Sequence, residues 1–276
     1  MDDLKNLQHY DKAIIFAYPR NAGGKFLINS LGLSPKFALQ CSILATAQLS
    51  NIITPRQKHQ LLIDRLDEVG DTWDDLRLGN LFGHEFNRLL KNTPEKLTAV
   101  PSILSQLMHQ DFYIPIIAHT VEELAVLKRF LVYAQVIEFV NTKPFMINRT
   151  MKSIEEYWQV VRGEQWPSQP PTSIDEIKSL PNFIQEELRT HFKNEIYEYF
   201  TPNDIEAGMT SFLNGNSIKW DCTNYFLENN CVSNIKLLYD QLNLDCWDHD
   251  NISSYYRKWT AVLDHIKNKT LSKMVA

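Results

Sequence analysis

Near the start of the chain, an apolar run is followed by small residues and then by an amphipathic segment. Residues 13–17 read Ala-Ile-Ile-Phe-Ala, which has the length and character of a buried strand. Pro19 and the Gly23-Gly24 pair favour a tight turn. The next segment has one apolar helical face, formed by Phe26, Leu27 and Leu31. The pattern predicts a strand, a loop and a helix that begins near Gly24.

The same order of strand and helix occurs twice more. Residues 112–118 form an apolar run that ends at His119, and the capping pattern Thr120-Val-Glu-Glu predicts a helix through Phe130. A second run at 136–140 ends at Asn141 and leads into a helix toward residue 161. Strands alternating with helices form parallel sheets with right-handed crossovers. We therefore predict a helix-rich, P-loop-like α/β fold: three α/β/α layers around a short central parallel sheet.

Most of the remaining chain has helical periodicity. Helices are predicted at 37–50, 55–69, 81–91, 102–109, 230–243 and 250–267. Four prolines between 163 and 181 predict a loop or linker there. We expect one domain over 1–276, with a core at 12–160 and a mostly helical C-terminal part at about 172–270.

Composition narrows the class of protein. The 276 residues are 44% hydrophobic, which suffices for a substantial core. The net charge of −5 argues against a nonspecific nucleic-acid binder. The cysteines at 41, 222, 231 and 246 form no C-x-x-C pair, so reduced thiols are expected. The N-terminus is polar, and no apolar stretch approaches the roughly 18 residues that a membrane span needs. We therefore expect a cytoplasmic protein that has no membrane span.

The first predicted loop has the features of an anion site. The first amides of a helix lack partners within the helix and carry the positive end of its dipole, and Arg20 and Lys25 add charge beside them. A phosphate or sulfate ester would fit. Only Gly24-Lys25 remains of the G-x-x-x-x-G-K-[ST] pattern, and Phe26 replaces the hydroxyl that would hold magnesium. An ordinary ATPase or kinase is therefore disfavoured, and a βα turn with glycines for close packing stays an alternative.

Other motifs point to structure more than to chemistry. His84-Glu85 lacks the second histidine of a zinc helix. The Trp-Asp pairs at 73–74, 220–221 and 247–248 lack the spacing of a calcium loop and are interpreted as solvated turns beside a packed indole. Residues 255–259 are interpreted as a helix face packed on the core, with Arg257 and Lys258 outside.

Three of these elements together resemble the sulfotransferase superfamily. Tyr18-Pro-Arg-Asn-Ala-Gly-Gly-Lys-Phe-Leu resembles its 5′-phosphosulfate loop, and Ile117-Ala-His119-Thr-Val-Glu-Glu-Leu is similar to the segment whose histidine is the general base. Gln135-Val-Ile-Glu-Phe-Val-Asn141 and the helix after it resemble the 3′-phosphate element. That element has Arg at the strand end and Ser eight residues later, where this chain has Asn141 and Arg149.

The resemblance implies transfer of a sulfuryl group from 3′-phosphoadenosine 5′-phosphosulfate, without a metal, to a hydroxyl or amine of a small-molecule or glycan acceptor. His119 would be the base and Lys25 would stabilise the leaving phosphate. Arg149 or Lys143 would supply the displaced positive charge. The donor would be bound by Arg20, Asn21, Ala22, Gly23, Gly24, Lys25, Phe26, Asn141 and Arg149. A non-catalytic nucleotide or phosphoester-binding protein and a divergent P-loop kinase-like protein are the alternatives, and the oligomeric state is left open.

Overall fold

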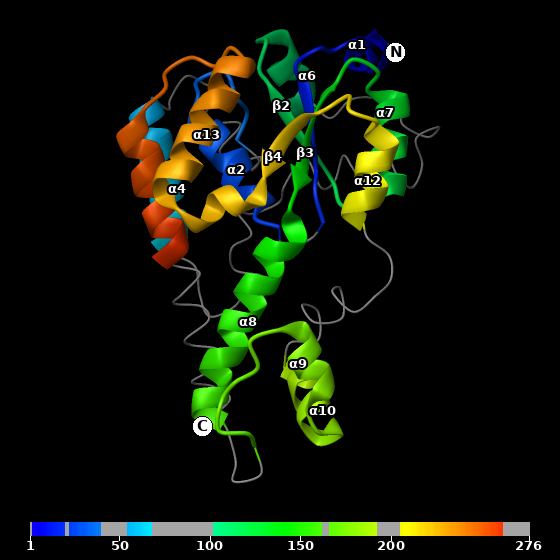
Figure 1. Ribbon diagram of the computed structural model, residues 1–276. Coiled ribbons are helices and arrows are strands. Elements are labelled where there is room, and N and C mark those ends of the chain that lie inside the picture. Colours follow the sequence, from blue (N-terminus) through cyan, green and yellow to red (C-terminus); the bar gives the residue numbers. More distant parts are fainter. Residues whose placement is uncertain are drawn as a thin grey trace.

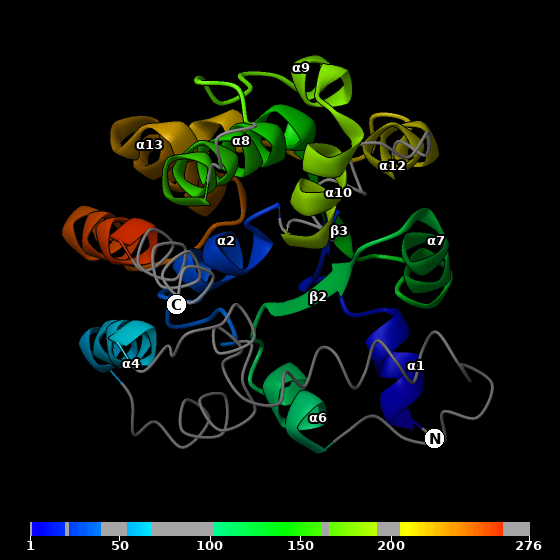
Figure 2. The same ribbon diagram turned by 90° about the horizontal axis from the view of Figure 1, so that it is seen from below.

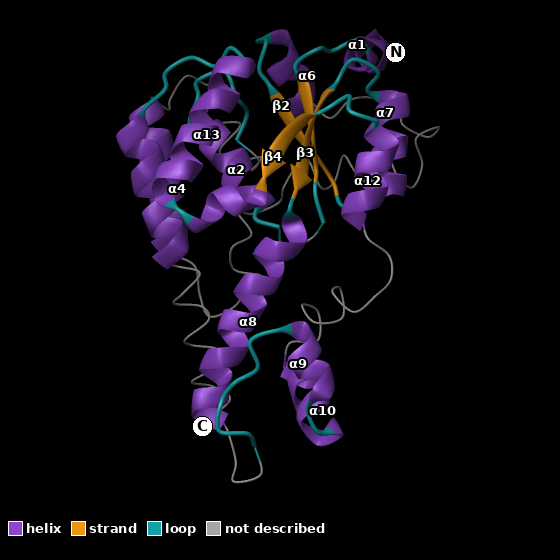
Figure 3. Cartoon of the chain, in the orientation of Figure 1, coloured by secondary structure: helices purple, strands orange, loops and turns teal. Residues whose placement is uncertain are grey.

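Four parallel strands form the centre of the molecule (Figure 3). The computed structural model describes residues 2–19, 22–39, 54–67, 102–161, 166–191 and 205–261. The strands are β1 (Ala13–Ala17), β2 (Ile114–Ala118), β3 (Gln135–Val140) and β4 (Ile218–Asp221). They are arranged in the order β2-β1-β3-β4, so β1 lies between the two strands that His119 and Asn141 follow.

Helices surround this sheet (Figure 1). They are α1 (Asp2–Gln8), α2 (Gly24–Leu31), α4 (Pro55–Asp67), α6 (Ser102–His109), α7 (Val121–Phe130), α8 (Thr142–Val161), α9 (Ile174–Ser179), α10 (Asn182–His191), α12 (Ile205–Leu213), the 3₁₀ helix η3 (Cys222–Phe226) and α13 (Glu228–Gln241). Residues 249–261 are also helical.

Alternate residues of β1, β2 and β3 face two separate cores, as the period of a strand requires. Ile14 and Phe16 of β1 pack with α2, α13 and residues 249–261, whereas Ala13 and Ile15 pack with α1, α6, α7 and α12. Figure 2 shows α2 and α13 on one side of the sheet and α7 and α12 on the other. The three-layer α/β/α prediction is therefore confirmed.

One strand carries a buried acid in its apolar run. Glu138 of β3 is 1% exposed, and its carboxylate accepts hydrogen bonds from the hydroxyls of Thr210 and Ser217, both at 2.5 Å. Thr210 belongs to α12, and Ser217 immediately precedes β4. Because a buried carboxylate is stable only when it is hydrogen-bonded, this side chain fixes both segments to β3.

A third, smaller core lies away from the sheet. α8 leaves the end of β3 and extends beyond the body of the molecule, with α9 and α10 beside its far end (Figure 1). Ile154 and Trp158 of α8 pack there against Ile177 of α9 and against Ile184 and Leu188 of α10. The indole N–H of Trp158 also donates to the Pro167 carbonyl at 3.0 Å.

Most predicted elements that fall on described residues are confirmed, but two differ and one strand was not predicted. Residues 37–39 are not helical, because Phe37 bridges Tyr113 beside β2. α9 lies inside the segment predicted as a linker. β4 was not predicted, and it places the indole of Trp220 in the core and not in a turn. The predictions at 40–50 and 81–91, the His84-Glu85 pair and the first Trp-Asp pair lie outside the described residues.

Among the described helices, none is both long and apolar enough to cross a bilayer. The described cysteines, Cys222, Cys231 and Cys246, are free thiols, and burial raises the pKa of the first two.

Candidate functional site

The β1–α2 loop is shaped by two glycines for different reasons. Gly23 has φ 77°, a left-handed conformation that strains any other residue. Gly24 opens α2 beneath the ring of Tyr18, and a Cβ at this position would lie 2.1 Å from a ring carbon. The Tyr18 ring is itself buried, at 3% exposure. The backbone of the loop is therefore held close to the end of β1.

The segment after β4 supports this loop from a distant part of the sequence. The hydroxyl of Tyr225 in η3 donates to the Gly23 carbonyl at 3.0 Å, and the Phe26 amide donates to the same oxygen at 3.0 Å. The ring of Tyr225 also contacts Phe145, in the first turns of α8, with ring centroids 5.1 Å apart. η3 thus connects the loop at the end of β1 with the helix that follows β3.

The N-terminus of α2 has the electrostatics of an anion site. In the part of the chain that the structure describes, no side chain caps α2, and its first turn carries no acidic residue. α7 differs, because Thr120 accepts from the Glu123 amide and acidic residues occupy its first turn. Lys25, which is half-buried, lies in the first turn of α2. The dipole of α2 and a lysine therefore act together at this end of the sheet.

His119 is held against the end of β1. Its Nδ1 lies 3.0 Å from the Tyr18 carbonyl oxygen, and its ring meets the Tyr18 ring edge-on, with centroids 4.9 Å apart. Its own amide donates to the Glu123 carboxylate at 2.7 Å. A carbonyl only accepts, so Nδ1 carries the proton in the neutral ring and Nε2 carries the lone pair. That assignment gives Nε2 the capacity of a base.

At the end of β3, acidic side chains hold the backbone. Asn141 is exposed, with φ 56°. Its amide and the Thr142 amide each donate to the Glu206 carboxylate of α12 at 2.8 Å. The Asn141 side chain donates to Asp221, at the end of β4, also at 2.8 Å. The amide of Thr142, the first residue of α8, is thus already engaged by a carboxylate of the chain.

The predicted site residues therefore divide into groups. One group lies at the carboxyl end of the sheet and consists of Ala22, Gly23, Gly24, Lys25 and His119. β1 and β2 pair through Ala17 and Ala118 immediately before this end. Asn141 follows the neighbouring strand β3. Arg20 and Asn21 lie outside the described residues, and only the backbone of Arg149 is described, within α8.

Phe26 differs from its predicted role as a donor-binding residue. Its side chain is 1% exposed and stacks on Trp259, with centroids 4.4 Å apart, and on Tyr255. With its amide bonded to Gly23, Phe26 fixes the helix to the core. The aromatic face predicted at 255–259 is confirmed by the same contacts, and Arg257 pairs outside with Glu228.

Sequence reasoning missed Tyr225, Glu206 and Asp221. Tyr225 is 202 positions from Gly23, and Glu206 is 65 from Asn141, so no local pattern connects them. The alternation of Ile218 and Trp220 with polar residues was the available signal for β4, and with it the position of Asp221 at a strand end.

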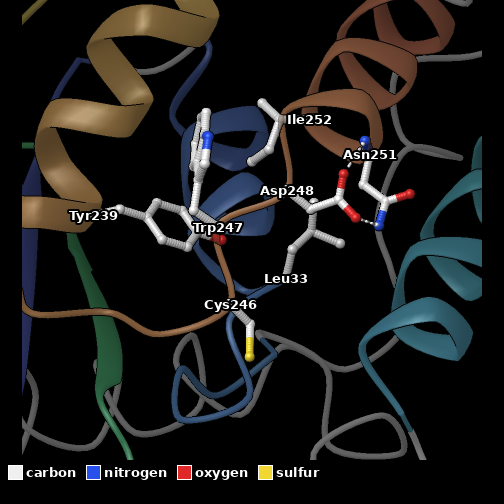
Figure 4. A pocket seen from close by; sticks show the side chains of 7 residues that line it. All are labelled: Leu33, Tyr239, Cys246, Trp247, Asp248, Asn251 and Ile252. Carbon is white, nitrogen blue, oxygen red and sulfur yellow. Dashed lines mark hydrogen bonds between the residues drawn. The ribbon is translucent and has the colours of Figure 1, made fainter.

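A pocket of about 160 Å³ lies elsewhere, beyond the C-terminal end of α2. Figure 4 shows the side chains that line it: Leu33, Tyr239, Cys246, Trp247, Asp248, Asn251 and Ile252. The Asp248 carboxylate accepts from the backbone and side-chain amides of Asn251, at 3.0 and 2.7 Å. Because the β1–α2 loop is at the other end of α2, this pocket is separate from the candidate site.

Within the described ranges, no three His, Cys, Asp or Glu side chains gather closely enough to hold a metal ion. Comparison of the chain with protein-family models, curated proteins and solved structures finds no match.

Proposed function

We propose that the protein is a sulfotransferase-like enzyme that binds a nucleoside 5′-phosphosulfate at the β1–α2 loop and transfers its sulfuryl group to an acceptor hydroxyl or amine. The donor class includes 3′-phosphoadenosine 5′-phosphosulfate, which the sequence resemblance implies. The single observation that carries the proposal is the position of His119, whose Nδ1 is bonded to the Tyr18 carbonyl at 3.0 Å beside the uncapped end of α2. A base and an anion site are thus adjacent.

The groups at this end match the needs of the reaction. The lone pair of the acceptor forms a bond to sulfur, the bond from sulfur to the bridging oxygen breaks, and that electron pair stays on the departing 5′-phosphate. Nε2 of His119 takes the proton of the acceptor, because Nδ1–H is directed to Tyr18. The amides that open α2 and the charge of Lys25 stabilise the departing phosphate.

Ligand binding is the first test. Calorimetric titration with adenosine 5′-phosphosulfate and with its 3′-phosphorylated form is compared with ATP plus magnesium. We expect at least one phosphosulfate nucleotide to bind tenfold more tightly than ATP with magnesium, because Phe26 replaces the hydroxyl that would hold the metal. Binding of ATP with magnesium alone would refute the proposal.

Turnover is the second test, with an acceptor found among alcohols, phenols, amines and oligosaccharides. His119→Ala is expected to lower turnover by about 100-fold or more and to leave donor affinity nearly unchanged. Lys25→Ala is expected to lower both turnover and donor affinity, since the charge of Lys25 acts on the bound phosphate and on the leaving group. His249→Ala and Lys236→Ala, at exposed positions on the helices outside the site, are the matched controls. Full activity of both site variants contradicts the assignment, and donor binding without turnover supports a non-catalytic binding protein instead.

A further inference from the structure

The pocket beyond the C-terminal end of α2 lies apart from the groups of the proposed transfer, and it has the walls of a ligand site (Figure 4). Leu33, Tyr239 and Ile252 line it and are 6%, 1% and 0% exposed. The indole of Trp247 meets the Tyr239 ring edge-on, with centroids 5.2 Å apart. Apolar and aromatic side chains of the core therefore border a space that a small molecule can enter.

The size of the pocket limits the ligand to a small ring system. Its volume is about 160 Å³. Sites for drug-sized ligands enclose roughly 300 Å³ or more, whereas an apolar cavity of roughly 150 Å³ accommodates benzene. Aromatic walls favour an aromatic ligand, because rings attract one another in edge-on and offset arrangements.

The polar side of the pocket favours a ligand without charge. The Asp248 carboxylate accepts from the backbone and side-chain amides of Asn251, at 3.0 and 2.7 Å, and uses one oxygen for each bond. Its negative charge remains and repels an anion. A cation would find both oxygens already engaged by Asn251.

A second, independent feature lies beside Asp248 and Asn251. Nε2 of His59, in α4, is buried, and in the described part of the chain no group forms a hydrogen bond with it. Burial lowers the pKa of His59, and the Asp248 carboxylate and a hydrogen bond with the Asn251 backbone oppose this shift only in part. The imidazole is therefore neutral at pH 7.

The neutral ring of His59 leaves an acceptor without a donor. A hydrogen bond that raises the pKa of a histidine is accepted by the backbone carbonyl, so the N–H of the ring is directed to Asn251. Nε2 then carries the lone pair. A buried polar atom without a partner is rare in folded proteins and indicates a place for a bound group.

We propose that this pocket is a second ligand site, which binds a small uncharged aromatic molecule that carries one hydrogen-bond donor. The ring of the ligand packs against Tyr239 and Trp247, and its donor bonds to Nε2 of His59. The site is independent of the proposed function, since the β1–α2 loop lies at the other end of α2.

The test uses indole and benzofuran, two ring systems of nearly equal shape that differ in one N–H donor. Each is titrated into the full chain while two-dimensional amide NMR spectra are recorded. Shifts are expected at residues 247–252, and indole is expected to bind about fivefold more tightly, the usual effect of one hydrogen bond. His59→Leu should abolish this preference. His249→Leu, an exposed neighbour of Asp248, is the matched control and should keep it.

Two further comparisons test the walls and the charge of the pocket. Trp247→Ala removes one aromatic wall at a partly exposed position and should weaken both ligands at least fivefold. Benzoate and benzylammonium should bind at least tenfold more weakly than indole. Binding of neither ring system, equal binding of both, a preference that survives His59→Leu, unchanged affinities in Trp247→Ala, or tighter binding of either ion would each overturn the inference. None of these outcomes bears on the proposed function.

Discussion

The ring of Tyr18 is enclosed by His119 and Phe139, with ring centroids 4.9 and 4.8 Å away, and by the backbone of Gly24. A methyl group at position 24 would overlap the ring, which cannot move without displacing His119. The tight turn was predictable from the Gly23-Gly24 pair. The lack of room for a side chain at position 24 was not predictable, because it depends on how the strand and the helix pack against the Tyr18 ring.

Gly24→Ala is therefore expected to destabilise the protein by about 3 kcal/mol, the upper range for overpacking. Urea denaturation followed by circular dichroism measures it. Gly215→Ala is the control, because Gly215 has φ 81° but no neighbour within 4 Å of a built Cβ. Its cost is that of backbone strain alone, about 1 kcal/mol. Equal losses in the two variants would contradict the close contact at Tyr18.

Lys58 is a buried cation that the helical pattern of residues 55–69 did not reveal. It is 1% exposed, and its ammonium group donates to the carbonyls of Gly32, Ser34 and Phe37, at 2.8, 2.6 and 3.3 Å. These carbonyls follow the C-terminal end of α2. Burial lowers the pKa of Lys58 from 10.5 to about 7.

The shift makes stability depend on pH with a defined sign. Between pH 7 and 10.5 the unfolded chain binds the Lys58 proton and the folded chain does not, so the free energy of unfolding rises with pH, by at most about 1.4 kcal/mol per pH unit. Below pH 7 both states are protonated and the slope vanishes. The wild type minus Lys58→Met difference, measured by urea denaturation from pH 6 to 9, should show this rise. A flat difference would mean that the three carbonyls keep the lysine charged.

At the scale of elements, α2 is held at each end by a tyrosine hydroxyl. Tyr225 donates to the Gly23 carbonyl before the helix, and Tyr239 of α13 donates to the Ser30 carbonyl in its last turn, both at 3.0 Å. The two bonds are chemically alike and differ in their distance from the β1–α2 loop. Removing each bond in turn therefore distinguishes an effect on the β1–α2 loop from an effect on α2 as a whole.

Tyr225→Phe and Tyr239→Phe are each expected to lower the free energy of unfolding by about 1 kcal/mol, the usual worth of one hydrogen bond. Only Tyr225→Phe should weaken nucleotide binding, by roughly threefold to tenfold, because it releases the carbonyl that positions the loop. Calorimetric titration of both variants measures the two nucleotide affinities. An equal loss of affinity in the two would show that α2 responds as one rigid unit.

The elements with strong apolar runs or caps, from β1 to α8, were predictable because their local signals agree with their packing. β4 was not, since its burial pattern places one fully buried residue, Trp220, among partly exposed ones. The helix expected at 37–50 does not extend over Phe37, because Tyr113 pairs with its backbone and tertiary pairing overrides helical propensity. The β1–α2 loop and His119 could be placed together because the carboxyl ends of parallel strands meet at one edge of a sheet. The contact of Glu206 with Asn141 could not be predicted, because it joins residues 65 positions apart.

At the scale of the whole molecule, the sheet and the far end of α8 have separate cores. The third core is formed by apolar side chains of α8, α9 and α10, while the strands share the two larger cores. The two regions are connected along α8. We expect them to differ in local stability, because separate cores allow local unfolding below the global free energy.

Ile184→Ala in α10 removes a fully buried side chain and is expected to cost about 2–4 kcal/mol locally. Hydrogen exchange should speed up in α9 and α10 while the amides of β1 and β3 stay protected, and nucleotide affinity should not change. Ile137→Ala in β3, equally buried, is the control and should lower protection throughout the sheet. Uniform loss of protection in both variants would mean that the molecule unfolds as a single unit.

The hydrogen bond from Tyr225 to Gly23 also orders events during synthesis. The β1–α2 loop is translated before the hydroxyl that fixes it, which follows 202 positions later, and β4, the strand just before that tyrosine, joins the sheet equally late. A nascent chain that already contains the loop, His119 and Asn141 still lacks the groups that hold them. The candidate site is therefore assembled only after Tyr225 has been translated, so a chain that stops before this residue does not acquire it.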